Sequence, residues 1–308
     1  LSDQIFRVVV TAGGMSSLII LGLIFAFLAY RGIGVIRIEG LGFITNSNWD
    51  VIEDESSNII SQDYGLAAML VGTILSATVA VIVGVPIAVF SALFLEFYSG
   101  RKARSVLIAL IDLMAAFPSI LYGLWGFFVL MPMAEYWATL IQKWLGWIYI
   151  FDVPDPIYTR SPFIAGLVLA IMIIPIVTSV SREVFSQTPL DRIQAAYALG
   201  ATRWAMIKAV VIPHGRNGVI GGAMLGLGRA MGETVAVFTV LNIVFQVNWQ
   251  VLLGAGGNVA SLIILKFGEA NPYEIKALMA AGLILFLLTL LVNAIANVIV
   301  KTTGKSGR

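Results

Sequence analysis

The feature that most constrains this chain is a set of long apolar segments with almost no charge. A helix needs about 20 mostly apolar residues to cross a bilayer, and six segments are long enough. They are residues 8–30, 66–95, 106–133, 162–181, 217–247 and 277–300. Charged side chains occur in only two of them: Asp112 in the third, and Arg229 and Glu233 in the fifth.

The composition also indicates a membrane protein. Of the 308 residues, 59% are hydrophobic and 12% are charged, and the mean hydropathy is +0.95, whereas soluble domains carry about 25% charged residues. The sequence therefore predicts an all-α membrane protein with six transmembrane helices. Residues 1–63 would hold the first helix and an external loop, 64–303 a core of five helices, and 304–308 a cytoplasmic tail.

Several functional classes are disfavoured by what the chain lacks. It has no cysteine, which excludes disulfides, thiolate metal sites and cysteine nucleophiles, and its one histidine, His214, cannot build a multi-histidine metal site. The net charge of +2 comes from dispersed basic residues, which argues against a nucleic-acid partner. An intramembrane enzyme is disfavoured as well, because no segment carries paired aspartates.

Lysine and arginine residues in the flanks of the apolar segments indicate the orientation. The larger set, predicted to be cytoplasmic, is Arg7, Arg101, Lys102, Arg104, Arg182, Arg192, Arg203, Lys208, Arg216, Lys301, Lys305 and Arg308. The smaller set, predicted to be external, is Arg31, Arg37, Lys143, Arg160, Lys266 and Lys276. Both termini would then be cytoplasmic. The acidic loop that would be external contains Glu39, Asp50, Glu53, Asp54, Glu55 and Asp63.

One external segment, residues 135–151, is rich in aromatic side chains. The apolar residues that recur in it at helical spacing are Trp137, Leu140, Ile141, Trp144 and Ile148. This pattern is typical of an amphipathic helix that lies at the membrane interface. A docking site for a partner is the alternative interpretation.

The largest cytoplasmic loop is predicted to form two short helices joined at a glycine. Thr188 is expected to cap the first helix, with Pro189 at its first position. Gly200 can adopt the left-handed conformation that ends this helix. Thr202 would cap the second helix, and Pro213 would stop it, because the residue before a proline is disfavoured in the helical region. The predicted product is a helix–turn–helix at the membrane surface.

The fifth apolar segment carries a stripe of glycines that ends in two charges. Gly218, Gly222, Gly226, Arg229 and Glu233 are spaced by four, four, three and four residues, so they share one helix face. Glycines four residues apart permit close helix packing in a bilayer. Arg229 lies about 18 Å into the segment at the helical rise, near the midplane. A charge there costs roughly 2.5–3.5 kcal/mol, so we expect it to have a partner.

Two interpretations of this arginine remain open. Arg229 and Glu233 could pair only to neutralise each other and brace the bundle. Alternatively, the guanidinium of Arg229 meets an anionic substrate, and Glu233 holds it when no anion is present. Asp112 is expected to have a structural role, because a carboxylate repels an anion and the basic residues 101–104 are close in sequence.

The large cytoplasmic loop also contains a spaced motif. Its residues are Gln194, Ala195, Ala196, Gly200, Val210, Ile212 and Pro213. The motif resembles the cytoplasmic loop of ABC-importer permeases, whose pattern is Glu-Ala-Ala, three residues, Gly, nine residues, Ile-x-Leu-Pro. Glutamine stands here where glutamate is usual. The resemblance implies a type I ABC importer permease fold with a cytoplasmic coupling helix that docks into an ATPase subunit; an ordinary basic loop is the alternative.

Two membrane segments carry a closer resemblance. Residues 228–234 read Gly-Arg-Ala-Met-Gly-Glu-Thr, and residues 117–124 read Phe-Pro-Ser-Ile-Leu-Tyr-Gly-Leu. Both are similar to segments of C-type permease subunits of bacterial phosphate-specific ABC importers, and the resemblance covers nearly the whole chain. It implies that Arg229 and Glu233 act in translocation.

The same resemblance implies a bacterial inner-membrane location and a set of partners. These are a second permease of the A type, an ATPase dimer, an external phosphate-binding protein, membrane lipid and inorganic phosphate. ATP and magnesium would be bound by the ATPase and no cofactor by this chain, whose residues 304–306 imitate a P-loop without its first glycine. The chain is thus expected to be a transporter subunit and not an enzyme. A permease for molybdate, sulfate or phosphonate, and a membrane signalling or scaffold protein, remain alternatives.

Overall fold

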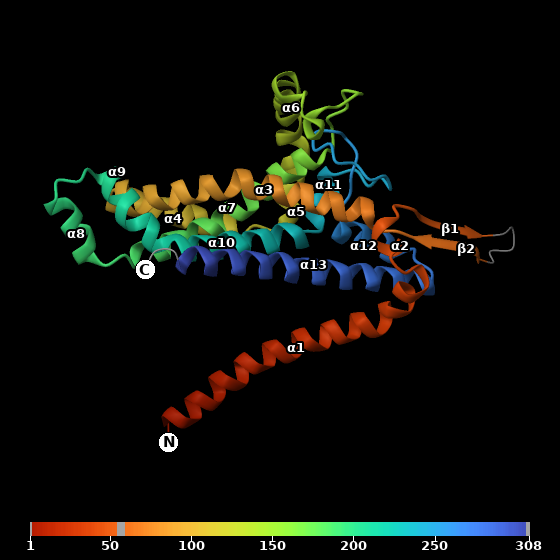
Figure 1. The fold of residues 1–308 in the computed structure, drawn as a ribbon, viewed down its shortest axis with the longest axis horizontal. Helices are drawn as coiled ribbons and strands as arrows, with labels where there is room; N and C mark the ends of the chain where they lie inside the picture. The colour runs from red at the N-terminus through yellow and green to blue at the C-terminus, as the bar shows by residue number, and fades with distance from the viewer. Residues whose placement is uncertain (1, 54–58, 306–308) are drawn as a thin grey trace.

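The computed structural model describes residues 2–53 and 59–305, which form a helix bundle with a hairpin at one end (Figure 1). The long helices are α1 (Ser2–Glu39), α3 (Ala67–Leu93), α4 (Arg101–Ala116), α7 (Pro162–Ser186), α10 (Ile212–Gly232) and α13 (Pro272–Lys305). The shorter helices are α2 (Gly42–Thr45), α5 (Ser119–Trp125), α6 (Met131–Leu145), α8 (Leu190–Ala198), α9 (Arg203–Met206), α11 (Val235–Val240) and α12 (Val259–Phe267). Wide π-helical turns occur at η1 (Phe94–Tyr98), η2 (Gly126–Leu130) and η4 (Ile207–Val211), and η3 (Tyr149–Phe151) is a 3₁₀ turn.

Helix α7 is the centre of the bundle, because it packs against both α3 and α10. Its apolar residues are buried on several sides, and Ser161 caps its start by accepting a hydrogen bond from the backbone N–H of Ile164. Gly166 lies against Val79 of α3 so closely that a side chain there would clash. On α3, Gly84 fits against Ile173 in the same way. Small residues thus let these helices approach closely.

Five helical segments in the described residues are long and apolar enough to cross a membrane. They are Asp3–Glu39, Ala67–Tyr98, Ser119–Leu145, Pro162–Ser186 and Pro272–Ala296. The prediction of one continuous helix over 106–133 is wrong, because α4 ends at Ala116 and α5 begins at Ser119, directly after Pro118. The prediction over 217–247 is also wrong as a single helix, since α10 ends at Gly232. The predicted count of six spans stays a prediction.

The interface segment is helical only in its first part. Helix α6 continues directly from α5 and η2 and projects sideways from the bundle (Figure 1). It ends at Leu145, so the prediction of a helix through residue 151 is wrong, and a turn begins at Gly146. The buried face of α6 includes Ala134 and Ala138, whereas Trp144 is exposed. This leaves the aromatic face free to contact lipid.

The end of the molecule that carries the hairpin is held by buried aromatic contacts. Strands β1 (Trp49–Glu53) and β2 (Ile59–Tyr64) pair in an antiparallel hairpin. Two residues of the acidic loop that was predicted to be external, Asp54 and Glu55, lie outside the described residues. Trp49 donates from its indole N–H to the buried carboxylate of Glu274 at 2.8 Å. Burial raises the pKa of Tyr64, and the nearby negative charge of Glu274 raises it further by a smaller amount. The hairpin is therefore fixed to the start of α13.

The two ends of the described chain lie on the same side of the bundle. Helix α1 packs against α13 where Gly32 lies against Ala280. The first half of α1 points away from the bundle (Figure 1). Helix α1 begins, and α13 ends, toward the end that carries α8 and α9, away from the hairpin. Residues 304 and 305 of the predicted tail continue α13, and 306–308 lie outside the described residues.

Candidate functional site

The loop between α7 and α10 forms a projecting helical unit at one end of the bundle (Figure 1). Gly200 has a φ of 81°, the left-handed conformation that was predicted to follow the first helix. Thr202 accepts a hydrogen bond from the N–H of Ala205 at 3.3 Å, which confirms its predicted cap. The cap predicted at Thr188 is wrong, because α8 begins at Leu190 and the Thr188 hydroxyl has no partner among the described residues.

Pro213 does not stop the second helix, contrary to the prediction. Helix α9 passes through the wide turn η4 into α10, with Pro213 in the first turn of α10. A proline is tolerated there because its missing N–H and its ring fit a first turn, and the π-helical turn before it supplies the space. The unit is thus a short helix, a turn, and a long helix that continues into the bundle.

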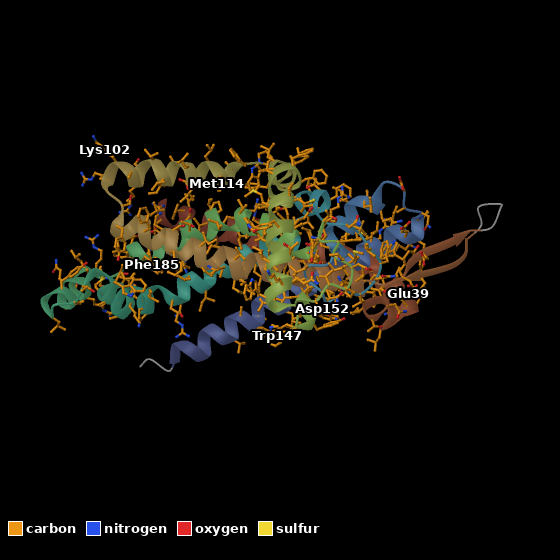
Figure 2. The ribbon with its side chains drawn as sticks, turned by 90° about the horizontal axis from the view of Figure 1, so that it is seen from above. Glu39, Lys102, Met114, Trp147, Asp152 and Phe185 are labelled. Carbon is orange, nitrogen blue, oxygen red and sulfur yellow. The ribbon has the colours of Figure 1, made fainter. Side chains whose placement is uncertain are left out.

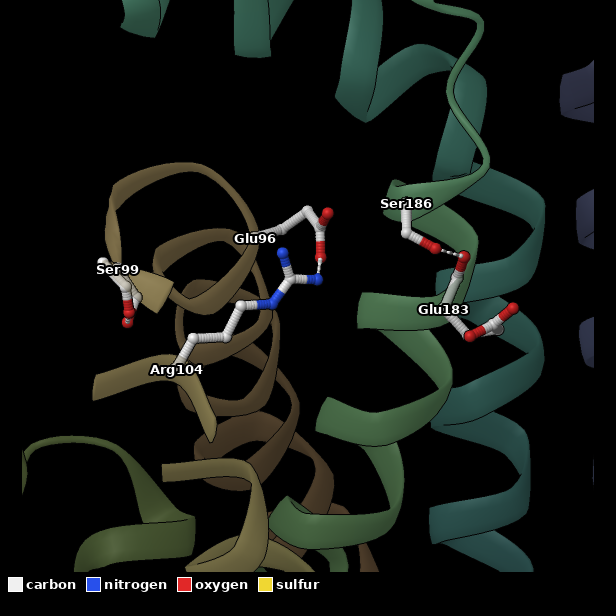
Figure 3. A network of polar contacts seen from close by, with 6 residues as sticks. Glu96, Ser99, Arg104, Glu183 and Ser186 are labelled. Atoms are coloured by element: carbon white, nitrogen blue, oxygen red, sulfur yellow. Dashed lines mark hydrogen bonds and ion pairs between the residues drawn. The ribbon is translucent and has the colours of Figure 1, made fainter. Parts of the chain in front are cut away.

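The base of this unit packs against the ends of the bundle helices that lie nearest to α8 and α9. Phe185 of α7, labelled in Figure 2, and Met206 of α9 are buried together in one apolar cluster. The guanidinium carbon of Arg203 lies 5.2 Å from the ring centroid of Tyr98. Near Tyr98 in the sequence, Arg104 forms an ion pair with Glu96, and this pair links α4 to η1 (Figure 3). The projecting unit therefore packs against α3, α7 and α10.

The outer surface of this unit carries the predicted coupling residues. Gln194, Ala195 and Gly200 are exposed, and Ala196 is partly buried. A groove of about 530 Å³ runs between α8 and the start of α10. Its lining includes Ala195, Ala196 and Pro213. Three of the five predicted coupling residues therefore share one open groove.

The glycines of α10 form the expected packing seam, and their partner is α7. Gly218 lies against Val184, and a Cβ at Gly222 would lie 3.1 Å from Val180. A Cβ at Gly226 would lie 3.0 Å from Val177. Any larger side chain in this row would force the two helices apart.

The predicted ion pair between Arg229 and Glu233 is not formed. Helix α10 ends at Gly232, and Glu233 has an extended backbone with φ −71° and ψ 130°. Its side chain therefore does not follow Arg229 on a helix face, and the spacing rule fails. Instead, a Glu233 carboxylate oxygen accepts a hydrogen bond from the N–H of Ala236 at 3.4 Å, at the start of α11.

The break between α10 and α11 is held by residues from the start of α12. The side-chain amide of Asn258 donates to the carbonyl of Glu233 at 2.9 Å, and its oxygen accepts from the N–H of Ser261 at 2.6 Å. The Ser261 hydroxyl donates to the carbonyl of Thr234 at 3.1 Å. These bonds satisfy backbone carbonyls that the helix break would leave without partners.

Arg229 lies in the last turn of α10, directly before the break. Its side chain is exposed, and among the described residues no carboxylate forms an ion pair with it. The C-terminal end of a helix favours a cation, which offsets part of the cost of the charge. Asp112, exposed on α4, likewise has no ion pair among the described residues.

A second arginine, Arg160, was predicted only as an external flanking charge, and it lines a cavity. Arg160 has a φ of 53°, which is uncommon for a residue other than glycine. Its guanidinium carbon lies 5.3 Å from the ring centroid of Phe127. The cavity, of about 490 Å³, is also lined by Asn242. No sequence motif marks this site, because its walls come from distant parts of the chain.

Solved structures with a similar fold are chains of bacterial ABC transporters. A chain of the inward-facing MetNI methionine ABC transporter matches with a TM-score of 0.53 and 18% identity, over 77% of this chain and 94% of that chain. A chain of a bacterial alginate ABC transporter, in complex with an alginate-bound periplasmic protein, matches with a TM-score of 0.59 and 16% identity, over 99% and 98% of the two chains. The fold is therefore that of ABC importer permeases, as the motif in the cytoplasmic loop predicted.

Sequence comparison gives the family. Residues 84–305 match the model of the binding-protein-dependent transport system inner membrane component, and this chain belongs to that family. A phosphate transport system permease protein, PstC 2 of Mycobacterium tuberculosis, is 40% identical over 96% of this chain and 91% of its own length. The corresponding PstC of Mycobacterium leprae is 41% identical over 89% and 85%, and that of Pasteurella multocida is 37% identical over 87% and 82%. The predicted family is confirmed.

Proposed function

We propose that this chain is the permease subunit of an ATP-driven phosphate importer and forms half of the translocation path. The observation that carries the proposal is Arg229, a cation at a helix break with no carboxylate partner among the described residues, in a chain that resembles phosphate permeases over almost all of its length. A guanidinium presents several N–H donors in a plane that matches two oxygens of a tetrahedral oxyanion. Because Glu233 does not neutralise Arg229, the guanidinium is available to an anion.

The path would be completed by a second permease subunit. Arg229 is exposed on the isolated chain and would be costly in contact with lipid. An A-type permease that covers this surface would leave the arginine facing an aqueous path between the two subunits. Membrane lipid would then surround the remaining apolar surface, of which α1 contributes a large part.

Energy would come from an ATPase dimer that binds at the projecting unit. ATP and magnesium would be bound by that partner, and this chain would carry neither the ATP site nor a cofactor. The exposed Gln194 and Ala195 and the groove beside Pro213 offer a contact surface for it. Helix α9, η4 and α10 form one continuous helical stretch that ends at the break beside Arg229. A displacement of α8 that moved α9 would therefore also move the end of α10.

The orientation follows from the charges. The projecting unit, the start of α1 and the end of α13 lie toward one end of the bundle, and the flanks there contain most of the lysines and arginines. That end would face the cytoplasm of the bacterial inner membrane. The hairpin would face outward, where a phosphate-binding protein delivers its ligand.

The deciding experiment is uptake of radiolabelled phosphate by vesicles that contain the whole complex, with the binding protein outside and ATP inside. Arg229→Gln should lower uptake at least about tenfold, since a hydrogen bond to a charged group contributes about 1.5–3 kcal/mol. Arg7→Gln, which changes an exposed arginine at the start of α1, is the control and should leave uptake unchanged. Near-normal uptake by Arg229→Gln would leave the arginine a structural role. Transport of molybdate, sulfate or phosphonate in place of phosphate would support the alternative substrate.

A further inference from the structure

The cavity beside Arg160 lies at the opposite end of α7 from the projecting unit. Arg160 precedes α7 by two residues, and α8 follows the end of that helix. Helix α7 has 25 residues, which corresponds to about 37 Å at the helical rise. In the orientation proposed above, Arg160 therefore lies at the external end of α7, and the cavity that it lines is on that side of the bundle.

Arg160 is held in place by its backbone and by an aromatic ring. Its carbonyl accepts a hydrogen bond from the N–H of Asn242 at 3.3 Å, and its φ of 53° is uncommon for a residue other than glycine. The guanidinium lies over the ring of Phe127. An aromatic face attracts a cation without neutralising it. Among the described residues, Arg160 has no ion pair with a carboxylate.

The donors in the cavity suit an oxyanion. The N–H groups of the Arg160 guanidinium are directed by a ring and not used by a carboxylate, so they remain available. Asn242 is exposed and lines the same cavity, and its amide can donate as well. The Thr239 hydroxyl, by contrast, already donates to the carbonyl of Ala236 at 2.7 Å. The site therefore contains one cation and one amide, surrounded largely by apolar side chains.

Helix α11 connects the surroundings of the two unpaired arginines. Arg229 lies in the last turn of α10, which ends at Gly232, and α11 begins at Val235. Phe238 and Thr239 of α11 line the cavity that contains Arg160. Helix α11 has 6 residues, which corresponds to about 9 Å at the helical rise, and it packs against α5. The cavity therefore adjoins the break beside Arg229 through one short helix.

We propose that Arg160 and Asn242 form an outer binding position for the transported oxyanion, occupied before the anion reaches Arg229. The proposal rests on the function proposed above. A cation at the outer end attracts an anion from the external side, and a second cation deeper in the path receives it. A different role for Arg160, an ion pair with a carboxylate of the second permease, is an outcome that the experiment must separate.

The test uses vesicles with the complete complex and compares three variants. Arg160→Asn removes the charge, and asparagine tolerates the left-handed backbone better than most residues. Arg160→Lys keeps the charge, and Lys143→Asn removes an exposed charge on α6 that does not line the cavity. The readouts are the initial rate of phosphate uptake at a series of binding-protein concentrations, and the subunit content of the purified complex.

We expect uptake by Arg160→Asn to fall about tenfold while the complex keeps all its subunits. Arg160→Lys should recover at least half of the wild-type rate, and Lys143→Asn should match the wild type. Wild-type uptake by Arg160→Asn, an equal loss in Arg160→Lys, or loss of the second permease from the complex would each overturn the proposal. If the unaltered complex transports no phosphate, the proposed function fails instead, so the two failures are distinguishable.

Discussion

Replacing Asn258 with alanine should loosen the break between α10 and α11 on which the position of Arg229 depends. The Asn258 side chain is fully buried and makes two hydrogen bonds, one to the N–H of Ser261 and one to the carbonyl of Glu233. Losing the helix cap costs about 1 kcal/mol. Leaving the partly buried Glu233 carbonyl unsatisfied adds about 1–3 kcal/mol. We therefore expect Asn258→Ala to lower the free energy of unfolding by about 2–4 kcal/mol.

A second substitution separates the two contributions. Asn258→Ser keeps an oxygen that can cap Ser261, but serine is too short to reach the Glu233 carbonyl. Its destabilisation should be smaller than that of alanine by about 1 kcal/mol. Asn271→Ala is a matched control, because Asn271 accepts hydrogen bonds from the N–H groups of Tyr273 and Glu274 at the start of α13, far from the break. It should cost about 1 kcal/mol and leave phosphate uptake nearly unchanged.

The measurement is a denaturant titration of the purified protein in detergent micelles, which yields the free energy of unfolding of each variant. Uptake by vesicles is measured in parallel. If Asn258→Ala unfolds like Asn271→Ala and transports at the wild-type rate, the hydrogen bonds of Asn258 do not hold the break, and the reasoning is refuted.

Three further predictions concern the packing, the turn and the outer end of the protein. Gly218→Ala should lower the free energy of unfolding by about 1–3 kcal/mol, because Gly218 lies against Val184. The control Gly221→Ala should cost nothing, because Gly221 faces open space. Equal unfolding midpoints for the two variants would contradict this prediction. Gly200→Val should reduce ATPase docking and phosphate uptake, since a β-branched residue resists a φ of 81°. Gly200→Asn should retain both. A pull-down of the ATPase with each variant measures docking, and equal recovery with Gly200→Val and the wild type would contradict the prediction. Because burial raises the pKa of Tyr64, stability should fall as the pH rises above about 10, where the unfolded state ionises first. Tyr64→Phe should reduce this slope, and the part that is left would come from the other tyrosines, such as Tyr273.

The positions that the sequence predicted correctly depend on local signals. Gly200 and Thr202 end one helix and begin the next through backbone geometry and a hydrogen bond three residues away, and neither requires a distant partner. The glycine row of α10 was also predicted as a packing seam, because the spacing of small residues defines a helix face. Its partner, α7, became known only from the structure.

The wrong predictions arise where a local rule competes with an arrangement that spans the chain. Pro213 would end an isolated helix, but the wide turn η4 accommodates it and the helix continues. Spacing alone placed Glu233 one turn after Arg229, but the helix ends at Gly232 between them. The hydrogen bonds to that break come from Asn258 and Ser261, 25 and 27 residues after the carbonyls that accept them, and no periodicity of the fifth segment can reveal them.

By itself, the sequence determined that this protein lies in a membrane, that it belongs to the ABC importer permeases, and that a glycine-stopped helix projects from its bundle. Apolar length, helix caps and a spaced motif suffice for this, because each involves residues close together in the chain. The tertiary structure alone decided that Arg229 has no carboxylate partner among the described residues and that Arg160 lies over Phe127 in a cavity. Those features depend on which distant segments meet, and the side chains that hold them acquire their partners only when the helices pack.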